Sequence, residues 1–162
     1  MEVHPVDVDE NERAGERSTA YIARIVESKL ASARALLAGH DALIVADTVV
    51  DVDGAILHKP EGNGAEMLRR LSARAHVVTT RFAVATTRDT HIESVSTRVV
   101  FRALDADEID AYVATGEGDD KAGGYAIQGR GAAFVARIEG SYGAVVGLPA
   151  CEVSVALRRL AR

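Results

Sequence analysis

A near-continuous apolar run from Ala42 to Val52 constrains the fold of this chain more than any other segment. Such a run, rich in β-branched residues and bounded by a turn signal, is typical of a sheet strand. Asp53 and Gly54 follow it, and this pair favours a tight hairpin turn into a returning strand that begins at Ala55. The run therefore predicts an apolar strand that ends in a hairpin.

The rest of the chain alternates between helix and strand patterns. Ser18 or Thr19 is placed to cap a helix that ends near Leu37, before Gly39. Further helices are expected near 63–71, 108–115 and 150–160, and β-rich runs at 76–87, 91–101 and 123–138, with a weak strand signal at 2–8. Hairpins combined with crossover helices predict an α/β fold with a mixed sheet covered by helices.

Bulk composition narrows the class of protein. A chain of 162 residues, 48% hydrophobic and 27% charged, fits one domain spanning residues 1–162 of the soluble globular type. The net charge of −5 argues against a nucleic-acid partner, whereas a few convergent lysines and a metal ion still allow a phosphate ligand. The single Cys151 fits a reducing compartment. With no apolar run near the ~20 residues that span a bilayer, we expect no membrane association and a cytoplasmic location.

Asp47 is the most informative single residue. A carboxylate within so apolar a strand is costly unless it is hydrogen-bonded, paired or bound to metal. On this strand alone, Asp47 is either a functional carboxylate or a structural one, which has reached solvent at a strand end or caps a neighbouring backbone group.

Several other polar residues are candidates of weaker signal. Pro60 biases Lys59 towards an extended backbone, and the two glycines after Lys121 let the backbone approach a ligand closely. Gln128 carries an amide that can read a base edge. For each, an exposed loop residue without such a role is the plain alternative.

Glu10 and Lys29 complete the candidate set. The acidic cluster that contains Glu10 provides oxygen ligands for a hard divalent ion, or is merely solvated. Lys29 shares one side of the first predicted helix with apolar residues, which suits a lysine at the edge of the core.

The order and wording of these motifs closely resemble the Maf family of nucleotide pyrophosphatases, from about Val6 onward. The motifs that carry the resemblance are Ala46-Asp47-Thr48-Val49-Val50, Lys59-Pro60, Leu71-Ser72, Gly116-Glu117, Asp120-Lys121-Ala122-Gly123, Tyr125-Ala126-Ile127-Gln128-Gly129, Ile138-Glu139-Gly140-Ser141-Tyr142 and Val145-Val146-Gly147-Leu148-Pro149. The resemblance implies an elongated mixed sheet of the Maf and inosine-triphosphatase type, a homodimer, and hydrolysis of a nucleoside triphosphate to the monophosphate and pyrophosphate.

The resemblance also implies roles for individual residues. Asp47 matches the family's proton acceptor, and Glu10 an acidic residue that, with Asp47, would hold a divalent metal, Mg²⁺ or Mn²⁺. Lys29, Lys59 and Lys121 match lysines that would neutralise the triphosphate. Thr48 and Gln128 match positions linked to substrate choice, and this pair resembles the branch that prefers dTTP and UTP.

Departures from the family pattern define the alternatives. Family members usually begin with a strand and a Leu-Ala-Ser-x-Ser-Pro-Arg-Arg type motif that binds phosphate, and Met1 lies beyond that point. Smaller departures are His58 for a glycine, Ala73 for a glycine, and Thr80-Arg81 where a glycine usually follows Thr79. Loss of charged phosphate contacts would weaken catalysis. A catalytically impaired nucleotide-binding protein therefore remains an alternative. A regulator of septum formation is another, which only the resemblance to the family implies.

Overall fold

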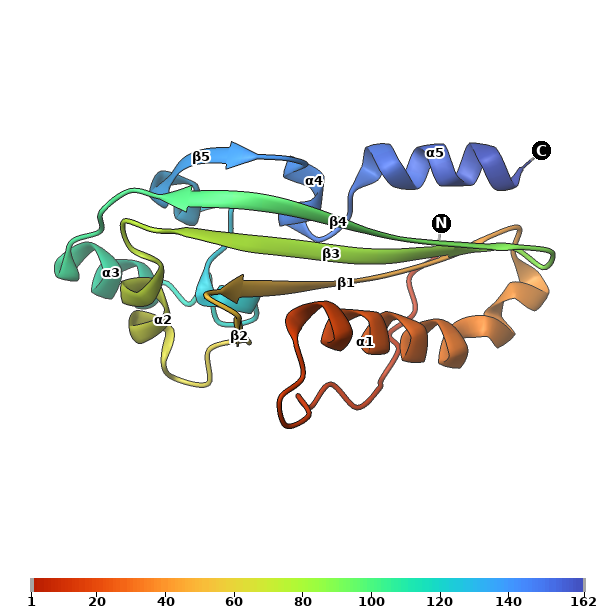
Figure 1. The fold of residues 1–162 in the computed structure, drawn as a ribbon, viewed down its shortest axis with the longest axis horizontal. Helices are drawn as coiled ribbons and strands as arrows, with labels where there is room; N and C mark the ends of the chain where they lie inside the picture. The colour runs from red at the N-terminus through yellow and green to blue at the C-terminus, as the bar shows by residue number, and fades with distance from the viewer. Residues whose placement is uncertain (1, 162) are drawn as a thin grey trace.

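An elongated five-stranded sheet of strand order β2-β1-β3-β4-β5 organises the fold (Figure 1). The computed structural model describes residues 2–161. The strands are β1 (Leu43–Val52), β2 (Ala55–Leu57), β3 (Ala75–Ala85), β4 (Thr90–Phe101) and β5 (Val135–Glu139). At about 3.4 Å per residue, the longest strand, β4, spans roughly 40 Å.

Helices cover both faces of the sheet (Figure 1). Helix α1 (Ser18–Ala33) continues into the 3₁₀ helix η1 (Arg34–Gly39) on one face, and α4 (Tyr142–Val146) and α5 (Ala150–Leu160) lie on the other. Helices α2 (Gly64–Leu71) and α3 (Ala106–Val113) pack at one end, near the short 3₁₀ helices η2 (Ala122–Gly124) and η3 (Arg130–Phe134). The predicted α/β class is confirmed. Among the described residues, no helix combines the length and the apolar character needed to cross a bilayer.

The periodicity of α1 explains its place on the sheet. Ile22, Ile25, Val26 and Leu30 are all buried, at helical spacings of three and four residues, and they face β1 and β3. The predicted helix is therefore confirmed, including its extension past Ala33. The predicted serine or threonine cap is wrong, because the helix starts at Ser18 itself and Arg17 precedes it without a side-chain cap.

The Asp53-Gly54 hairpin is confirmed. Both residues have positive φ, at 54° and 80°, as a two-residue hairpin turn of the primed type requires. The Asp51 carboxylate accepts a hydrogen bond of 2.9 Å from the Gly54 N–H. The turn sends the chain into β2, which pairs with β1 only from Val50 to Val52.

Three expectations of sheet structure need correction. All pairings within residues 2–161 are antiparallel, so the sheet is not mixed: β2 and β3 run in the same direction but flank β1 instead of each other. The 123–138 stretch is strand only from Val135, because Gly123 and Gly124 adopt positive φ and turn the chain. Residues 2–8 form no strand.

His76 lies inside the core at the α2 and α3 end of the sheet. Its side chain is buried, and its Nε2 lies 2.8 Å from the Tyr125 hydroxyl. The ring also packs edge-on against Phe101, with centroids 5.0 Å apart. Burial lowers the pKa of His76 to about 4, because the charged imidazolium loses its hydration there.

This burial predicts a loss of stability in acid. A neutral His76 contributes its full stability above the ordinary histidine pKa of about 6.5, and that stability is lost as the pH falls through the folded-state pKa of about 4. The loss is on the order of 3 kcal/mol. Urea unfolding across this pH range measures it, and His76→Gln, which cannot titrate, should show a shallower slope. Equal slopes in the two proteins would contradict the assignment.

Candidate active site

The centre of the site is an ion pair between β1 and α1. Val45, Asp47 and Val49 alternate onto the face of β1 that α1 covers, so the Asp47 carboxylate emerges between two buried valines. Lys29 projects from α1 towards it, with 3.3 Å between Nζ and Oδ2. Lys29 is therefore a charged partner for Asp47 that the sequence of the apolar strand alone did not reveal. This contact favours the functional interpretation of Asp47.

Glu10 reaches the same lysine from the irregular segment before α1. Its Oε1 lies 2.7 Å from Lys29 Nζ. Two side chains of α1 hold this segment: the Tyr21 hydroxyl donates to the Glu10 carbonyl at 3.0 Å, and Arg24 donates to the carbonyls of Asp9 and Asn11 at 3.3 and 2.9 Å. The three predicted residues Glu10, Lys29 and Asp47 thus meet at one point.

Tyr21 and Arg24 are positioning residues that sequence reasoning missed. Arg24 is itself fixed by the Glu16 carboxylate, at 2.8 and 2.6 Å from two of its nitrogens. The available signal was their spacing of three residues, which places both on one side of the helix beside an acidic segment. Such a spacing alone does not reveal which loop the two side chains hold.

The charges of the site perturb one another. Burial is the largest cause that raises the pKa of Asp47, and the attraction of Lys29 only partly offsets it. Burial also disfavours the Lys29 ammonium, but the hydrogen bond with Glu10 and the charges of Asp47 and Glu10 outweigh it, so the Lys29 pKa is raised. Burial therefore raises the pKa of Asp47, whereas the two neighbouring carboxylates raise that of Lys29. Lys29 stays charged, and Asp47 is a stronger base than a solvated aspartate.

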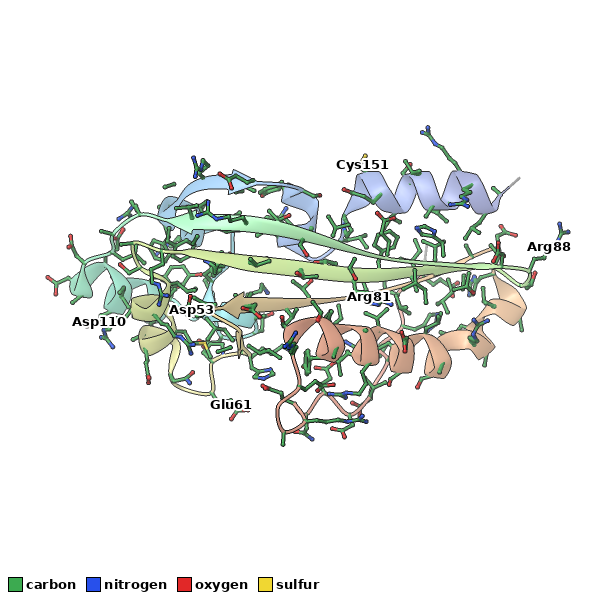
Figure 2. All side chains as sticks on the ribbon, viewed as in Figure 1. Asp53, Glu61, Arg81, Arg88, Asp110 and Cys151 are labelled. Carbon is green, nitrogen blue, oxygen red and sulfur yellow. The ribbon has the colours of Figure 1, made fainter. Side chains whose placement is uncertain are left out.

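Arg81 is a second cation beside Asp47. The two residues are directly opposite in the β1–β3 register, and cross-strand partners share a face. The Arg81 side chain lies between the sheet and α1 (Figure 2), where it donates to Ser94 at 3.0 Å and lies 3.5 Å from Glu27 of α1. Sequence reasoning had treated Arg81 only as a departure from the family pattern.

A polar cavity of about 660 Å³ opens at the edge of the sheet beside this cluster. Its lining includes Glu10, Lys29, Asp47, Thr48 and Lys59. The cavity exists because β2 pairs with β1 only from Val50 onward, which leaves the β1 edge before it without a strand partner among residues 2–161. An adjoining hollow of about 190 Å³ shares Asp47, Thr48 and Lys59 and adds Lys121.

The loop that carries Lys121 is fixed to the end of β2. The Gly123 N–H donates to the His58 carbonyl at 3.1 Å. Gly123 has a φ of +76°, and a Cβ there would lie 3.2 Å from the Val50 side chain, so glycine is needed at this close approach. Lys59 and Lys121 are exposed at the rim, and Lys121 is held by Asp120 at 2.7 Å.

The two predicted specificity residues, Thr48 and Gln128, lie differently with respect to the two hollows. Thr48 lines both hollows, on the opposite face of β1 from Asp47, and its hydroxyl lies 2.7 Å from that of Thr80. Gln128 is exposed and lines neither hollow, because Tyr125 and Ile127 take the inward positions of its segment. The role of Gln128 stays a prediction.

The donor set at Glu10 and Asp47 fits a hard divalent cation. Carboxylate oxygens are the ligands that Mg²⁺ and Mn²⁺ prefer. The Lys29 ammonium lies within 2.7 Å of one carboxylate and 3.3 Å of the other, so the two groups already converge on one positive charge. These residues therefore suit a metal next to the cavity.

A half-buried carboxylate with raised basicity, three lysines and an open polar cavity define a class of hydrolase-like α/β proteins that bind anionic substrates. The family comparison is more specific. The family model described as Maf-like protein matches residues 1–160, and the chain belongs to the Maf family.

Three similar curated proteins share one name. A dTTP/UTP pyrophosphatase of Methylococcus capsulatus is 46% identical over 99% of this chain and 80% of its own length. Proteins of the same name from Geotalea uraniireducens and Salmonella typhimurium are 47% and 45% identical, over 99% and 90% of this chain and 84% and 75% of their own lengths.

The raised pKa of Asp47 predicts that its ionised carboxylate lowers the free energy of unfolding. A folded-state pKa above the unfolded one means that stability is lost as the pH rises through it, so the ionised carboxylate destabilises the fold at neutral pH. We expect Asp47→Asn to raise the free energy of unfolding at pH 7. The gain should disappear below the ordinary aspartate pKa, where Asp47 is protonated in both states.

Urea unfolding at neutral and acid pH measures this difference. Asp107→Asn, at an exposed position in the first turn of α3, is the matched control. It removes only a favourable helix-dipole charge and should lower stability at pH 7 by at most ~1 kcal/mol, opposite in sign to the effect expected for Asp47→Asn. A less stable Asp47→Asn protein at pH 7 would mean that attraction to Lys29 outweighs the cost of burial.

Proposed function

We propose that this chain hydrolyses dTTP and UTP to the monophosphate and pyrophosphate. The observation that carries the proposal is the meeting of Asp47, Lys29 and Glu10 at the mouth of a polar cavity rimmed by lysines. Family membership and relatives named dTTP/UTP pyrophosphatase at 45–47% identity support the same reaction.

Asp47 is the proposed general base. Water attacks the α-phosphorus, its proton passes to the Asp47 carboxylate, and the bond from the α-phosphorus to the α–β bridging oxygen breaks. Pyrophosphate leaves with that oxygen. Burial raises the pKa of Asp47 and so strengthens it as a proton acceptor, while Lys29 holds the carboxylate in place.

The lysines are the proposed phosphate contacts. Lys59 and Lys121 lie at the rim of the 190 Å³ hollow, next to Asp47 and Thr48. Positive charge there would offset the charge that develops on the leaving pyrophosphate. Lys29 adds positive charge from the α1 side of the same strand.

Glu10 and Asp47 are the proposed ligands of a Mg²⁺ or Mn²⁺ ion. When bound, such an ion would polarise the phosphate oxygens and neutralise part of the triphosphate charge. Tyr21 and Arg24 would keep the Glu10 segment in reach through their contacts with its backbone.

Substrate choice is assigned to Thr48 and Gln128. Thr48 lines the hollows beside Asp47, and its hydroxyl is oriented by Thr80. The Gln128 amide, which can both donate and accept, suits the O4 and N3 edge of thymine or uracil. Because Gln128 is exposed, the base would lie at the outer rim of the site.

We also infer that the chain acts as a homodimer in the cytoplasm. Tyr142 and Val146 lie one helical turn apart on α4 and are 49% and 40% exposed, and Leu148 beside them is 41% exposed. Apolar side chains gathered on one surface mark an interaction site. The single Cys151 fits a reducing compartment.

The dimer can be tested by sedimentation. We expect twice the 17.2 kDa chain mass for the wild type and a shift towards monomer in Tyr142→Glu/Val146→Glu. Val155→Glu, at an exposed apolar residue of α5, is the matched control. A monomeric wild type, or a dimer that survives the double substitution, would contradict this interface.

Pyrophosphate release from a panel of nucleoside triphosphates tests the reaction. With Mg²⁺ or Mn²⁺ we expect dTTP and UTP to be turned over faster than dATP and GTP. Asp47→Asn should lower the rate at least ~100-fold, the usual size of a general-base effect, while nucleotide binding persists. Asp107→Asn should keep the wild-type rate.

Each result has a distinct meaning. Wild-type turnover in Asp47→Asn would exclude Asp47 as the base. Nucleotide binding by the wild type without any turnover would instead favour an impaired nucleotide-binding protein.

A further inference from the structure

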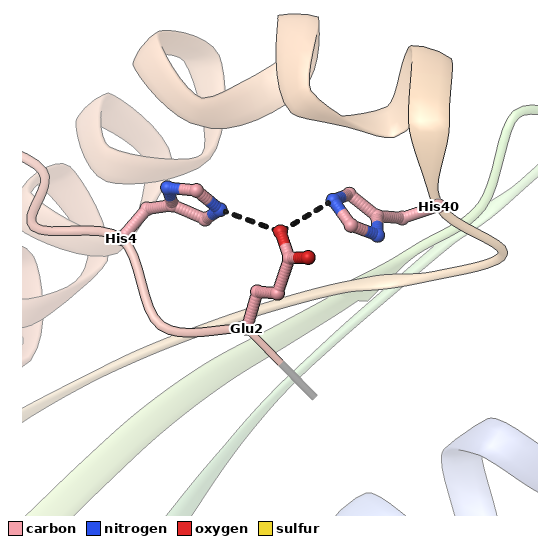
Figure 3. Close-up of side chains that lie close together, drawn as sticks. All are labelled: Glu2, His4 and His40. Atoms are coloured by element: carbon pink, nitrogen blue, oxygen red, sulfur yellow. Dashed lines mark hydrogen bonds and ion pairs between the residues drawn. The ribbon is translucent and has the colours of Figure 1, made fainter.

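Glu2, His4 and His40 form a side-chain cluster between the N-terminal segment and the end of η1 (Figure 3). Glu2 Oε2 lies 3.4 Å from Nε2 of His4 and 3.4 Å from Nε2 of His40. All three donor atoms lie within 4.8 Å of one another. The three side chains turn their donor atoms towards one point from two separate segments of the chain.

The backbone explains this convergence. Glu2 and His4 are two residues apart, and alternate residues of an extended segment share a side. Pro5 biases His4 towards the extended conformation. His40 follows the last turn of η1, where its N–H donates to the Leu37 carbonyl at 3.3 Å. The cluster therefore joins the irregular N-terminal segment to the end of the helix that carries Lys29.

Two of the three donor separations match a tetrahedral transition-metal site, and the third lies within 4.8 Å. Zinc bonds of about 2.1 Å to nitrogen and oxygen place neighbouring donor atoms of a tetrahedron about 3.4 Å apart. The two measured glutamate–histidine separations have this value. The two ring planes are inclined at 53°, so the imidazoles approach from different directions instead of stacking.

We propose that Glu2, His4 and His40 bind a first-row transition-metal ion of the Zn²⁺ class. Two imidazoles and one carboxylate suit Zn²⁺ far better than Mg²⁺, which prefers oxygen ligands. The three donors leave a fourth position for water. The bound ion would cross-link the N-terminal segment to the end of η1.

The location of this metal-mediated cross-link has a structural consequence. The same three residues line a cavity of about 490 Å³ that also contains Lys29, Val45 and Ala46. A metal at its outer end would order the segment that leads from Glu2 to Glu10. The site is nevertheless distinct from the Glu10 and Asp47 carboxylates, because it has its own donors and does not depend on the proposed hydrolysis.

Titration of metal-free protein with ZnCl₂ by calorimetry tests the proposal. We expect one equivalent of Zn²⁺ to bind, and His40→Ala, His4→Ala and Glu2→Gln each to weaken binding at least ~10-fold. All three side chains are exposed, so these variants should fold, and a matching circular dichroism spectrum checks this. His91→Ala is the matched control, because His91 also pairs with a glutamate but in a separate place.

Asp47→Asn separates this site from the catalytic carboxylates and should bind Zn²⁺ as the wild type does. In ¹⁵N spectra, Zn²⁺ should shift the Nε2 resonances of His4 and His40 and leave that of His91 in place. Absence of Zn²⁺ binding, unchanged affinity in His40→Ala, or loss of binding in Asp47→Asn would each overturn the proposal.

Discussion

The charge of Asp47 inside an apolar strand is the constraint on which the site depends. The carboxylate is compatible with its neighbours Val45 and Val49 only because Lys29 lies 3.3 Å away. That contact requires α1 to run along β1 in one register, which the buried Ile25 and Val26 set by packing on the sheet. The packing that stabilises α1 is therefore also what positions the Asp47–Lys29 pair.

The cavity follows from a mismatch in strand length. β1 spans ten residues and β2 only three, so the hairpin covers the far end of β1 and leaves the edge beside Asp47 accessible. A longer β2 would pair with that edge and fill the space that a substrate needs. On the opposite side of the cavity, Arg24 holds the segment around Glu10 by donating hydrogen bonds to its backbone carbonyls.

The sequence predicted those elements of the fold that local periodicity and turn residues determine. The helix α1, the apolar strand β1, its hairpin and the paired strands β3 and β4 all follow from spacing and turn chemistry. The path of residues 123–138 did not, because positive φ at Gly123 depends on a close approach to Val50 from another element. The short helix α4 was missed for a different reason, because five residues carry too little periodicity. Among the site residues, the meeting of Glu10, Lys29 and Asp47 was predictable only through family resemblance.

β1 contributes polar side chains to the cavities from both of its faces. Asp47 points to α1, whereas Thr48 points the other way, where its hydroxyl meets Thr80 and the Thr80 hydroxyl donates to the Ala144 carbonyl of α4 at 2.5 Å. The hollow beside Asp47 extends to Val146, whose side chain is among the exposed apolar residues of α4. A subunit contact on α4 would thus lie two hydrogen bonds from Thr48. Dimer formation would then stiffen the wall of the substrate site, because any movement of α4 reaches Thr48 through Thr80.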